Sequence, residues 1–117
     1  MRITEAAKIS GLSTDTIRYY ERAGLLPTIR RGTDKHRMFS AENVDWLTLL
    51  YWLRETGMPM KTMSQFAALY RQGDDTIAER KEILLAHSDH LKKRRSDLDH
   101  CENILAYKIS TYRKLEP

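Results

Sequence analysis

The sequence is poor in residues that cross-link a fold or interrupt a helix. It contains one cysteine, Cys101, three prolines and five glycines among 117 residues. A single cysteine excludes an intramolecular disulfide and is typical of a reducing compartment, so we expect a cytoplasmic protein.

No apolar run approaches the roughly 20 residues that a membrane helix requires. Glu5 and Lys8 interrupt the stretch in which a signal peptide would be apolar. We therefore expect no membrane partner.

The sequence also lacks the residue patterns of common enzymes. We find no paired carboxylates, no nucleophile with a histidine partner and no glycine loop that would hold a phosphate, so we expect neither an enzyme nor a cofactor. His87 and His90 have the i, i+3 spacing of a metal pair, and His100 follows in the same charged segment. Histidines on a charged helix are more often solvated, so no metal site is predicted.

Basic charge is concentrated at the two ends of the chain. Residues 1–37 hold eight Lys and Arg against four acids, and residues 92–117 hold seven against four. The intervening residues 38–91 hold five against eight, and the formal net charge of the whole chain is +4. This distribution is compatible with a polyanionic partner, although many ordinary surfaces share it.

The N-terminal residues predict two short helices joined by a turn. Residues 4–10 are good helix formers behind a plausible Thr4 cap. Gly11 tolerates the positive φ that ends such a helix. Ser13 is a good N-cap for the next helix, because its hydroxyl can accept a hydrogen bond from a free backbone amide.

The second helix is expected to turn one face toward a core and another toward a ligand. Ile17 and Tyr20 are three residues apart and share the inner face. Gly24 and Pro27 end the helix. The residues left largely outside are Thr14, Asp15, Thr16, Arg18 and Tyr19. A helix, a glycine-containing turn and a helix with outward donors make up the helix-turn-helix plan, which favours DNA as the partner.

Residues 28–39 predict an exposed, basic β-hairpin around the turn Gly32-Thr33-Asp34-Lys35. A charged loop would be the simpler interpretation of this segment alone. Beside a helix-turn-helix it is interpreted as a wing whose cations reach DNA phosphates or the minor groove. The wing residues predicted to bind DNA are Arg30, Arg31, Lys35, His36 and Arg37.

Two further helices follow, over residues 41–54 behind a Ser40 cap and over residues 60–71 after Pro59. Trp46 and Trp52 are expected to pack in the core. Lys61 lies at the start of the later helix, where free backbone amides favour a phosphate.

The last 40 or so residues predict a long helix that needs a partner. They follow Gln72-Gly73-Asp74-Asp75 and contain no glycine, and no proline before Pro117. Apolar residues recur every seven positions, which indicates a left-handed coiled coil, most simply with a second copy of the chain. The predicted dimerisation residues are Ile77, Leu84, Leu91, Leu98, Cys101, Leu105, Ile109 and Tyr112. We therefore predict two domains, a DNA-binding domain over 1–72 and a dimerisation helix over 73–117.

The combination of these motifs resembles the MerR family of bacterial transcription regulators. The resemblance is carried by Ile17-Arg18-Tyr19-Tyr20-Glu21, Gly24-Leu25-Leu26-Pro27 and a wing that ends in Arg37-Met38-Phe39. It implies a mostly α fold, with a winged helix-turn-helix head and a coiled-coil dimerisation helix that joins two protomers antiparallel. It also implies a homodimer that binds a palindromic promoter site and distorts it so that RNA polymerase can engage, commonly under an effector's control.

Residue by residue, the resemblance implies that Thr14, Thr16, Arg18 and Tyr19 face the major groove and its flanking phosphates. It places the basic hairpin residues in the first wing and Lys61 in the second.

The effector is less defined. Metal-sensing members use cysteines near the end of the dimer helix and in a following loop, and drug-sensing members append a ligand domain; neither pattern is expected here. The chain is most similar to the short branch that responds to aldehydes and other electrophiles, but Leu49–Leu53 lacks that branch's cysteine. Cys101 is either a small residue of the helix seam or a thiol sensor.

Two other functions remain compatible with the sequence. An architectural DNA-bending protein of the excisionase type would share the winged head without regulating polymerase. An adaptor would use the long helix to bind another protein.

Overall fold

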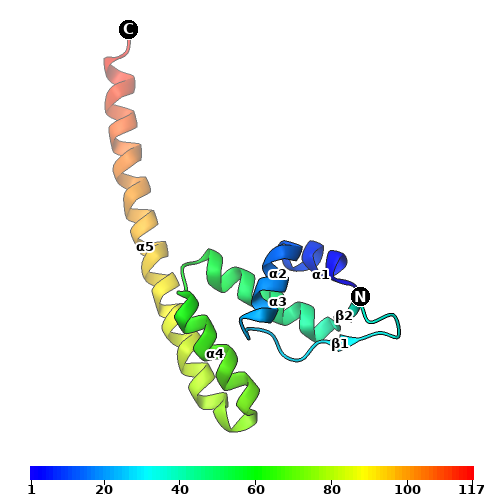
Figure 1. The fold of residues 1–117 in the computed structure, drawn as a ribbon. Coiled ribbons are helices and arrows are strands. Elements are labelled where there is room, and N and C mark those ends of the chain that lie inside the picture. Colours follow the sequence, from blue (N-terminus) through cyan, green and yellow to red (C-terminus); the bar gives the residue numbers. More distant parts are fainter. The chain divides into compact units, whose positions relative to one another are not determined.

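The computed structural model describes residues 1–117 and is mostly helical (Figure 1). The elements in chain order are α1 (Ile3–Ser10), α2 (Thr14–Arg22), β1 (Arg30–Arg31), β2 (Arg37–Met38), α3 (Ala41–Glu55), α4 (Met60–Gln72), the short 3-10 helix η1 (Asp74–Thr76) and α5 (Ile77–Leu115). This confirms the predicted fold class. The chain divides into two compact units, Met1–Ile83 and Leu84–Pro117, and α5 runs through both. The predicted division into functional domains after residue 72 stays a prediction.

The turn between α1 and α2 has the predicted geometry. Gly11 ends α1 with φ 91°, and its backbone N–H donates to the Ala7 carbonyl at 3.0 Å. Ser13 caps α2, since its Oγ accepts from the Thr16 backbone N–H at 3.0 Å. A side chain at position 11 would also approach the Tyr51 ring of α3, because a Cβ there would lie 3.1 Å from Cε1.

The predicted Thr4 cap is wrong. Helix α1 begins at Ile3, its N-cap is Arg2, and no side chain caps it. The reason is a long-range backbone pairing, in which the Phe39 N–H donates to the Met1 carbonyl at 2.7 Å and the Met1 amino group donates to the Phe39 carbonyl at 2.8 Å. After this pairing Arg2 is extended, with φ −84° and ψ 168°, and its carbonyl accepts the first helical bond, from Ala6.

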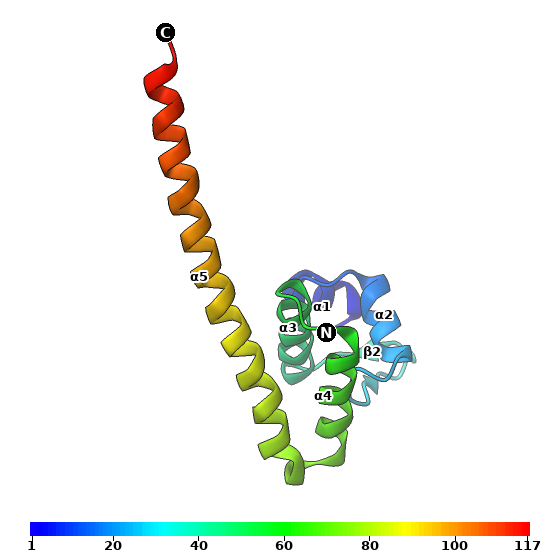
Figure 2. The ribbon, with the colours of Figure 1, turned by 90° about the vertical axis from the view of Figure 1, so that its left-hand side faces the viewer.

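The core of the N-terminal unit forms where α1 packs against both α2 and α3, with α4 against α3 (Figures 1 and 2). Ile17 and Tyr20 are fully buried, as predicted from their spacing. The other large side chains with almost no exposure are Phe39, Leu25, Leu47, Leu50 and Met63. Burying a side chain of this size contributes about 1.5–3 kcal/mol, so these residues fix the orientation of α2.

Helix α3 begins with the predicted Ser40 cap, to which Asn43 adds a reciprocal bond. Trp46 packs as expected, because its ring stacks on Phe66 with centroids 5.4 Å apart and its Nε1 donates to the Leu25 carbonyl at 2.9 Å. Trp52 does not, because its side chain is 58% exposed. The neighbouring Leu53 takes the inward position of that turn, which leaves Trp52 on the outer face.

Helix α5 is a single uninterrupted helix of 39 residues with no buried residue (Figure 2). At 1.5 Å per residue it is roughly 58 Å long. Leu98, Leu105 and Tyr112 of its heptad positions are all more than half exposed. None of the helices is both long enough and apolar enough to span a membrane.

Candidate nucleic-acid interface

Helix α2 presents its polar face outward because its apolar face is anchored. With Ile17 and Tyr20 in the core, Arg18 and Tyr19 are exposed, while Thr14 and Thr16 are half-buried. Arg18 Nη1 lies 3.4 Å from Asp15 Oδ1, and both side chains face solvent. An exposed pair of this kind contributes little, so the guanidinium can exchange the carboxylate for another anion.

The hairpin forms as predicted, with Arg30 paired to Met38 and Arg31 to Arg37. Its turn is closed by the Lys35 N–H, which donates to the Gly32 carbonyl at 3.0 Å, and Lys35 has φ 66°. The exposed cationic or titratable residues of the wing are Arg30, Arg31, Lys35 and His36.

Arg37 differs from the other wing cations because an acid of α2 already binds it. Its Nε donates to Glu21 Oε1 at 2.6 Å, and both side chains are about three-quarters buried. This ion pair joins β2 to α2. Its geometry suits fixing the wing against the helix better than contacting a ligand directly.

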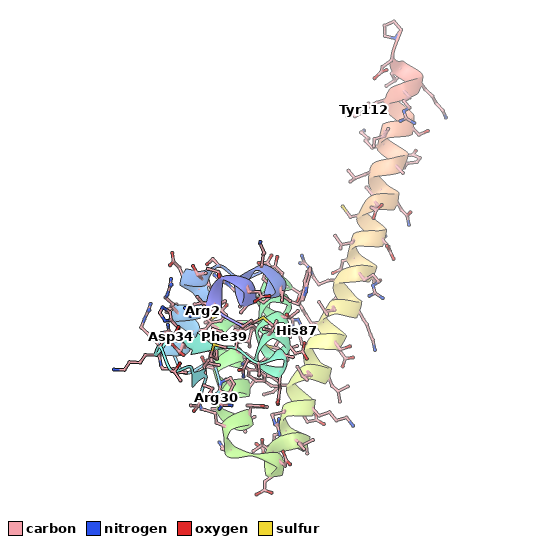
Figure 3. All side chains as sticks on the ribbon, turned by 90° about the vertical axis from the view of Figure 1, so that its right-hand side faces the viewer. Arg2, Arg30, Asp34, Phe39, His87 and Tyr112 are labelled. Atoms are coloured by element: carbon pink, nitrogen blue, oxygen red, sulfur yellow. The ribbon has the colours of Figure 1, made fainter.

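An open cavity of about 480 Å³ lies where the start of α1, α2 and the wing come together. We call it the wing notch. Its lining residues are Arg2, Ile3, Thr4, Arg18, Arg31, Asp34, Lys35, His36 and Arg37. The notch is strongly cationic and contains a single carboxylate, that of Asp34, which pairs with Arg2. Figure 3 labels these two residues on the head.

A second, smaller cavity of about 350 Å³ lies where α2 meets the end of α3 and the start of α4. We call it the helix notch. It is lined by Asp15, Thr16, Tyr19, Arg54 and Met60. Arg54 also donates from Nη1 to the hydroxyl of the buried Tyr20 at 3.3 Å, which ties this lining side chain to α2. The backbone amides of the first turn of α4 add positive potential nearby.

The structure thus gathers five of the ten predicted DNA-binding residues, Arg18, Arg31, Lys35, His36 and Arg37, around one notch and Thr16 and Tyr19 around the other. Thr14, Arg30 and Lys61 line neither notch, although Arg30 and Lys61 are exposed.

Sequence reasoning missed Arg2, Thr4 and Arg54. Arg2 and Thr4 join the site only through the pairing of Met1 with Phe39, which has no local sequence signal. Arg54 had a signal that could have been used, since a cation in the last turn of a helix lies beside the residues that begin the next one.

Comparison with known proteins identifies the family. Residues 1–69 match the family described as MerR HTH family regulatory protein, and residues 44–106 match the family described as MerR, DNA binding. The chain belongs to the MerR family. Members are DNA-binding transcription regulators and not enzymes, so the family assignment selects this function among those the sequence left open.

Two relatives of this MerR-family chain match most of its length. An uncharacterized HTH-type transcriptional regulator of Haemophilus influenzae is 36% identical over 110 residues, which are 94% of this chain and 82% of the relative. The HTH-type transcriptional regulator AdhR of Bacillus subtilis is 34% identical over 84 residues, which are 72% of this chain and 60% of AdhR.

Two solved structures have the same fold. A crystal structure of a MerR-family regulator from Listeria monocytogenes superposes with a TM-score of 0.85 at 37% identity, over 96% of this chain and 85% of the other. HiNmlR, a MerR-family regulator that lacks the sensor domain and was crystallised bound to promoter DNA, superposes with a TM-score of 0.86 at 34% identity, over 97% and 90% of the two chains.

Proposed function

We propose that this MerR-family chain acts in the cytoplasm as a homodimer that binds a palindromic promoter site and distorts the DNA. The distortion controls transcription by RNA polymerase on the same promoter, in response to an effector or a stress. The observation that carries this proposal is the position of α2, whose exposed Arg18 lines the cationic wing notch and whose exposed Tyr19 lines the helix notch beside Arg54.

The arrangement of the head suits a helix in the major groove. The outward-facing residues of α2 contact base edges and the phosphates beside them; these are the exposed Arg18 and Tyr19 and the half-buried Thr14 and Thr16. The wing residues Arg30, Arg31, Lys35 and His36 contact phosphates on one side of α2, and Arg54 and Lys61 do so on the other. Phosphate contacts fix the register of a protein on DNA, whereas contacts to base edges supply the sequence preference.

Dimerisation is supported by the apolar residues of α5. Residues Leu98, Leu105 and Tyr112 recur every seven positions and are exposed in the single chain. A helix roughly 58 Å long whose apolar stripe faces water needs a partner helix. A second copy of α5 supplies a matching stripe, and a twofold dimer then matches a palindromic site.

Distortion of the DNA follows from two linked heads. Bending a site by tens of degrees costs about 1–6 kcal/mol. Several phosphate contacts on each head can offset that cost only if the linkage between the heads is stiff. An uninterrupted α5 without glycine or internal proline suits such a linkage.

The test begins with in vitro selection of DNA sites from a random pool by the purified chain. We expect an inverted repeat, bound by two chains, and a bend detected by circular permutation of the site. Transcription by RNA polymerase from a promoter that contains the site between its two elements, at a long spacer, should change when the protein is added.

Each element of the proposal has an outcome that overturns it. Selection of a single asymmetric site would contradict the palindrome. A site that stays straight when bound would contradict the distortion. Bending without any effect on transcription would instead assign the protein an architectural function.

A further inference from the structure

The wing notch contains one feature that the proposed function leaves unexplained. Among its cationic side chains, Asp34 places a carboxylate in the region that a DNA phosphate would enter. Its Oδ2 pairs with Arg2 Nη2 and lies 3.4 Å from His36 Nδ1. A carboxylate and a phosphate oxygen bind the same donors of a guanidinium, so the two compete for Arg2.

The position of Asp34 is set by the hairpin turn and not by Arg2. Asp34 Oδ1 accepts from the His36 backbone N–H at 3.1 Å. The turn around it is closed by the hydrogen bonds from Lys35 to Gly32 at 3.0 Å and from Gly32 to His36 at 2.9 Å. The carboxylate therefore stays at the notch whether or not Arg2 contacts it.

Arg2, in contrast, can change partner. Its side chain is 54% exposed, and the ion pair with Asp34 is its only polar side-chain contact that we find. Rotation about the bonds of its long side chain can move the guanidinium from the carboxylate to another anion in the same notch. Arg18, Arg31 and Lys35 line that space as well and would contact the same anion.

We propose that the wing notch binds a backbone phosphate of DNA through Arg2, Arg18, Arg31 and Lys35, and that Asp34 holds the Arg2 guanidinium in the free protein and so weakens phosphate binding there. The inference rests on the proposed DNA-binding function and deepens it. Because a phosphate carries no base identity, Asp34 acts on every DNA sequence equally.

The state of Asp34 at neutral pH agrees with this competition. The backbone N–H of His36 lowers the pKa of the Asp34 carboxyl below its usual value of 3.8, more strongly than partial burial raises it, and the charge of Arg2 lowers it further. The carboxylate is therefore fully ionised wherever DNA binding would be measured.

The test compares Asp34→Asn with the wild-type chain on two duplexes, one from the in vitro selection and one of arbitrary sequence. Asparagine keeps an oxygen that can accept from the His36 N–H, so the turn is retained while the charge is removed. We expect affinity to rise about threefold to tenfold on both duplexes. We also expect the logarithm of the association constant to fall more steeply with the logarithm of the salt concentration. The slope should become more negative by about one, because one more phosphate contact is complete.

Two further variants separate the notch from a general charge effect. Asp45→Asn removes an exposed carboxylate of α3 that does not line the notch, and it should raise affinity less than Asp34→Asn does. In an Arg2→Ala background the gain from Asp34→Asn should shrink, because the residue for which carboxylate and phosphate compete is gone.

The outcomes are distinguishable from failure of the proposed function. Wild-type chain that binds no duplex would overturn the proposed function and this inference together. Wild-type chain that binds the selected duplex, with Asp34→Asn no tighter than Asp45→Asn, would overturn the inference alone. Weaker binding by Asp34→Asn would also overturn it, and would make Asp34 a residue that positions Arg2.

Discussion

At the scale of single residues, Arg18 is the side chain of α2 best placed to read DNA. Its guanidinium is exposed, and its only ion pair, with Asp15 at 3.4 Å, is weak because water surrounds it. A guanidinium can bond two acceptors of a guanine edge or two phosphate oxygens. The two roles differ in how binding depends on sequence, which makes them separable.

Replacing Arg18 with alanine should therefore weaken binding to the selected site by about 1–3 kcal/mol. If Arg18 reads a base, the loss should be confined to the preferred base at one position of each half-site. Titration of the variant against single-substitution duplexes measures this. Equal loss on every duplex, with a salt slope reduced by about one, would assign Arg18 to a phosphate.

Asp34 offers a second residue-scale prediction, this time in the free protein. Its carboxyl should titrate with a midpoint below 3.8, as followed by the carboxyl carbon signal in NMR spectra. Because the pKa is lowered in the folded chain, the stabilisation that Asp34 gives is complete above the unfolded pKa and is lost as pH falls through the folded pKa.

Arg2→Ala should move that midpoint upward but not fully to 3.8, since the hydrogen bond from the His36 N–H is the larger cause and persists. An Asp34 midpoint at or above 3.8 in the wild-type chain would contradict the contacts of the wing turn.

At the scale of elements, local chemistry made most of the fold predictable. Gly11 and Ser13 define the turn, Gly24 the end of α2 and Ser40 the start of α3, because each acts on backbone groups one turn away. These are interactions between near neighbours, so the sequence shows them directly.

The features that were not predicted depend on contacts between distant segments. Arg2 and Thr4 reach the wing notch because Met1 pairs with Phe39, 38 residues later. Trp52 is expected in the core from its residue type, whereas the register of α3, which buries Leu53, leaves it exposed. Large apolar residues favour burial only where the helix face permits it.

The turn between α1 and α2 gives an element-scale prediction. Gly11→Ala should destabilise the head by about 2–3 kcal/mol, because an L-residue is strained at φ 91° and its Cβ would lie 3.1 Å from the Tyr51 ring. Gly24→Ala is the matched control, with φ 80° and the end of the flexible Arg71 side chain at 3.3 Å. It should cost about 1 kcal/mol, since the Arg71 guanidinium can move aside.

Urea denaturation of both variants measures the difference. Equal losses would show that the positive φ alone matters and that Tyr51 yields without cost. A Gly11→Ala chain as stable as the wild type would contradict the geometry of the turn itself.

At the scale of the whole molecule, the function proposed here requires two chains. One head carries one α2 and therefore reads one half-site, and the phosphate contacts of one head have no second head against which to bend the duplex. Under the proposed function, the α5 residues exposed in the single chain would determine affinity for DNA without contacting it. Linking two binding modules raises affinity by factors of about 10²–10⁴ when both sites can be engaged at once.

Leu98→Asp should convert the dimer to a monomer, because it places a charge on the apolar heptad stripe. Leu98 is 58% exposed in the single chain and would be buried between two helices in a dimer. Sedimentation equilibrium measures the mass, and affinity for the palindrome should fall by about a hundredfold while affinity for a half-site duplex stays unchanged. Ser96→Asp adds the same charge to the same helix, two residues before Leu98 and on the face opposite the stripe, and should leave both quantities unaltered.

If Leu98→Asp still binds the palindrome as a dimer, α5 does not join the two chains through this stripe. If it is monomeric but binds the palindrome as tightly as the wild type, the heads do not depend on each other, and the distortion of DNA by two linked heads is ruled out.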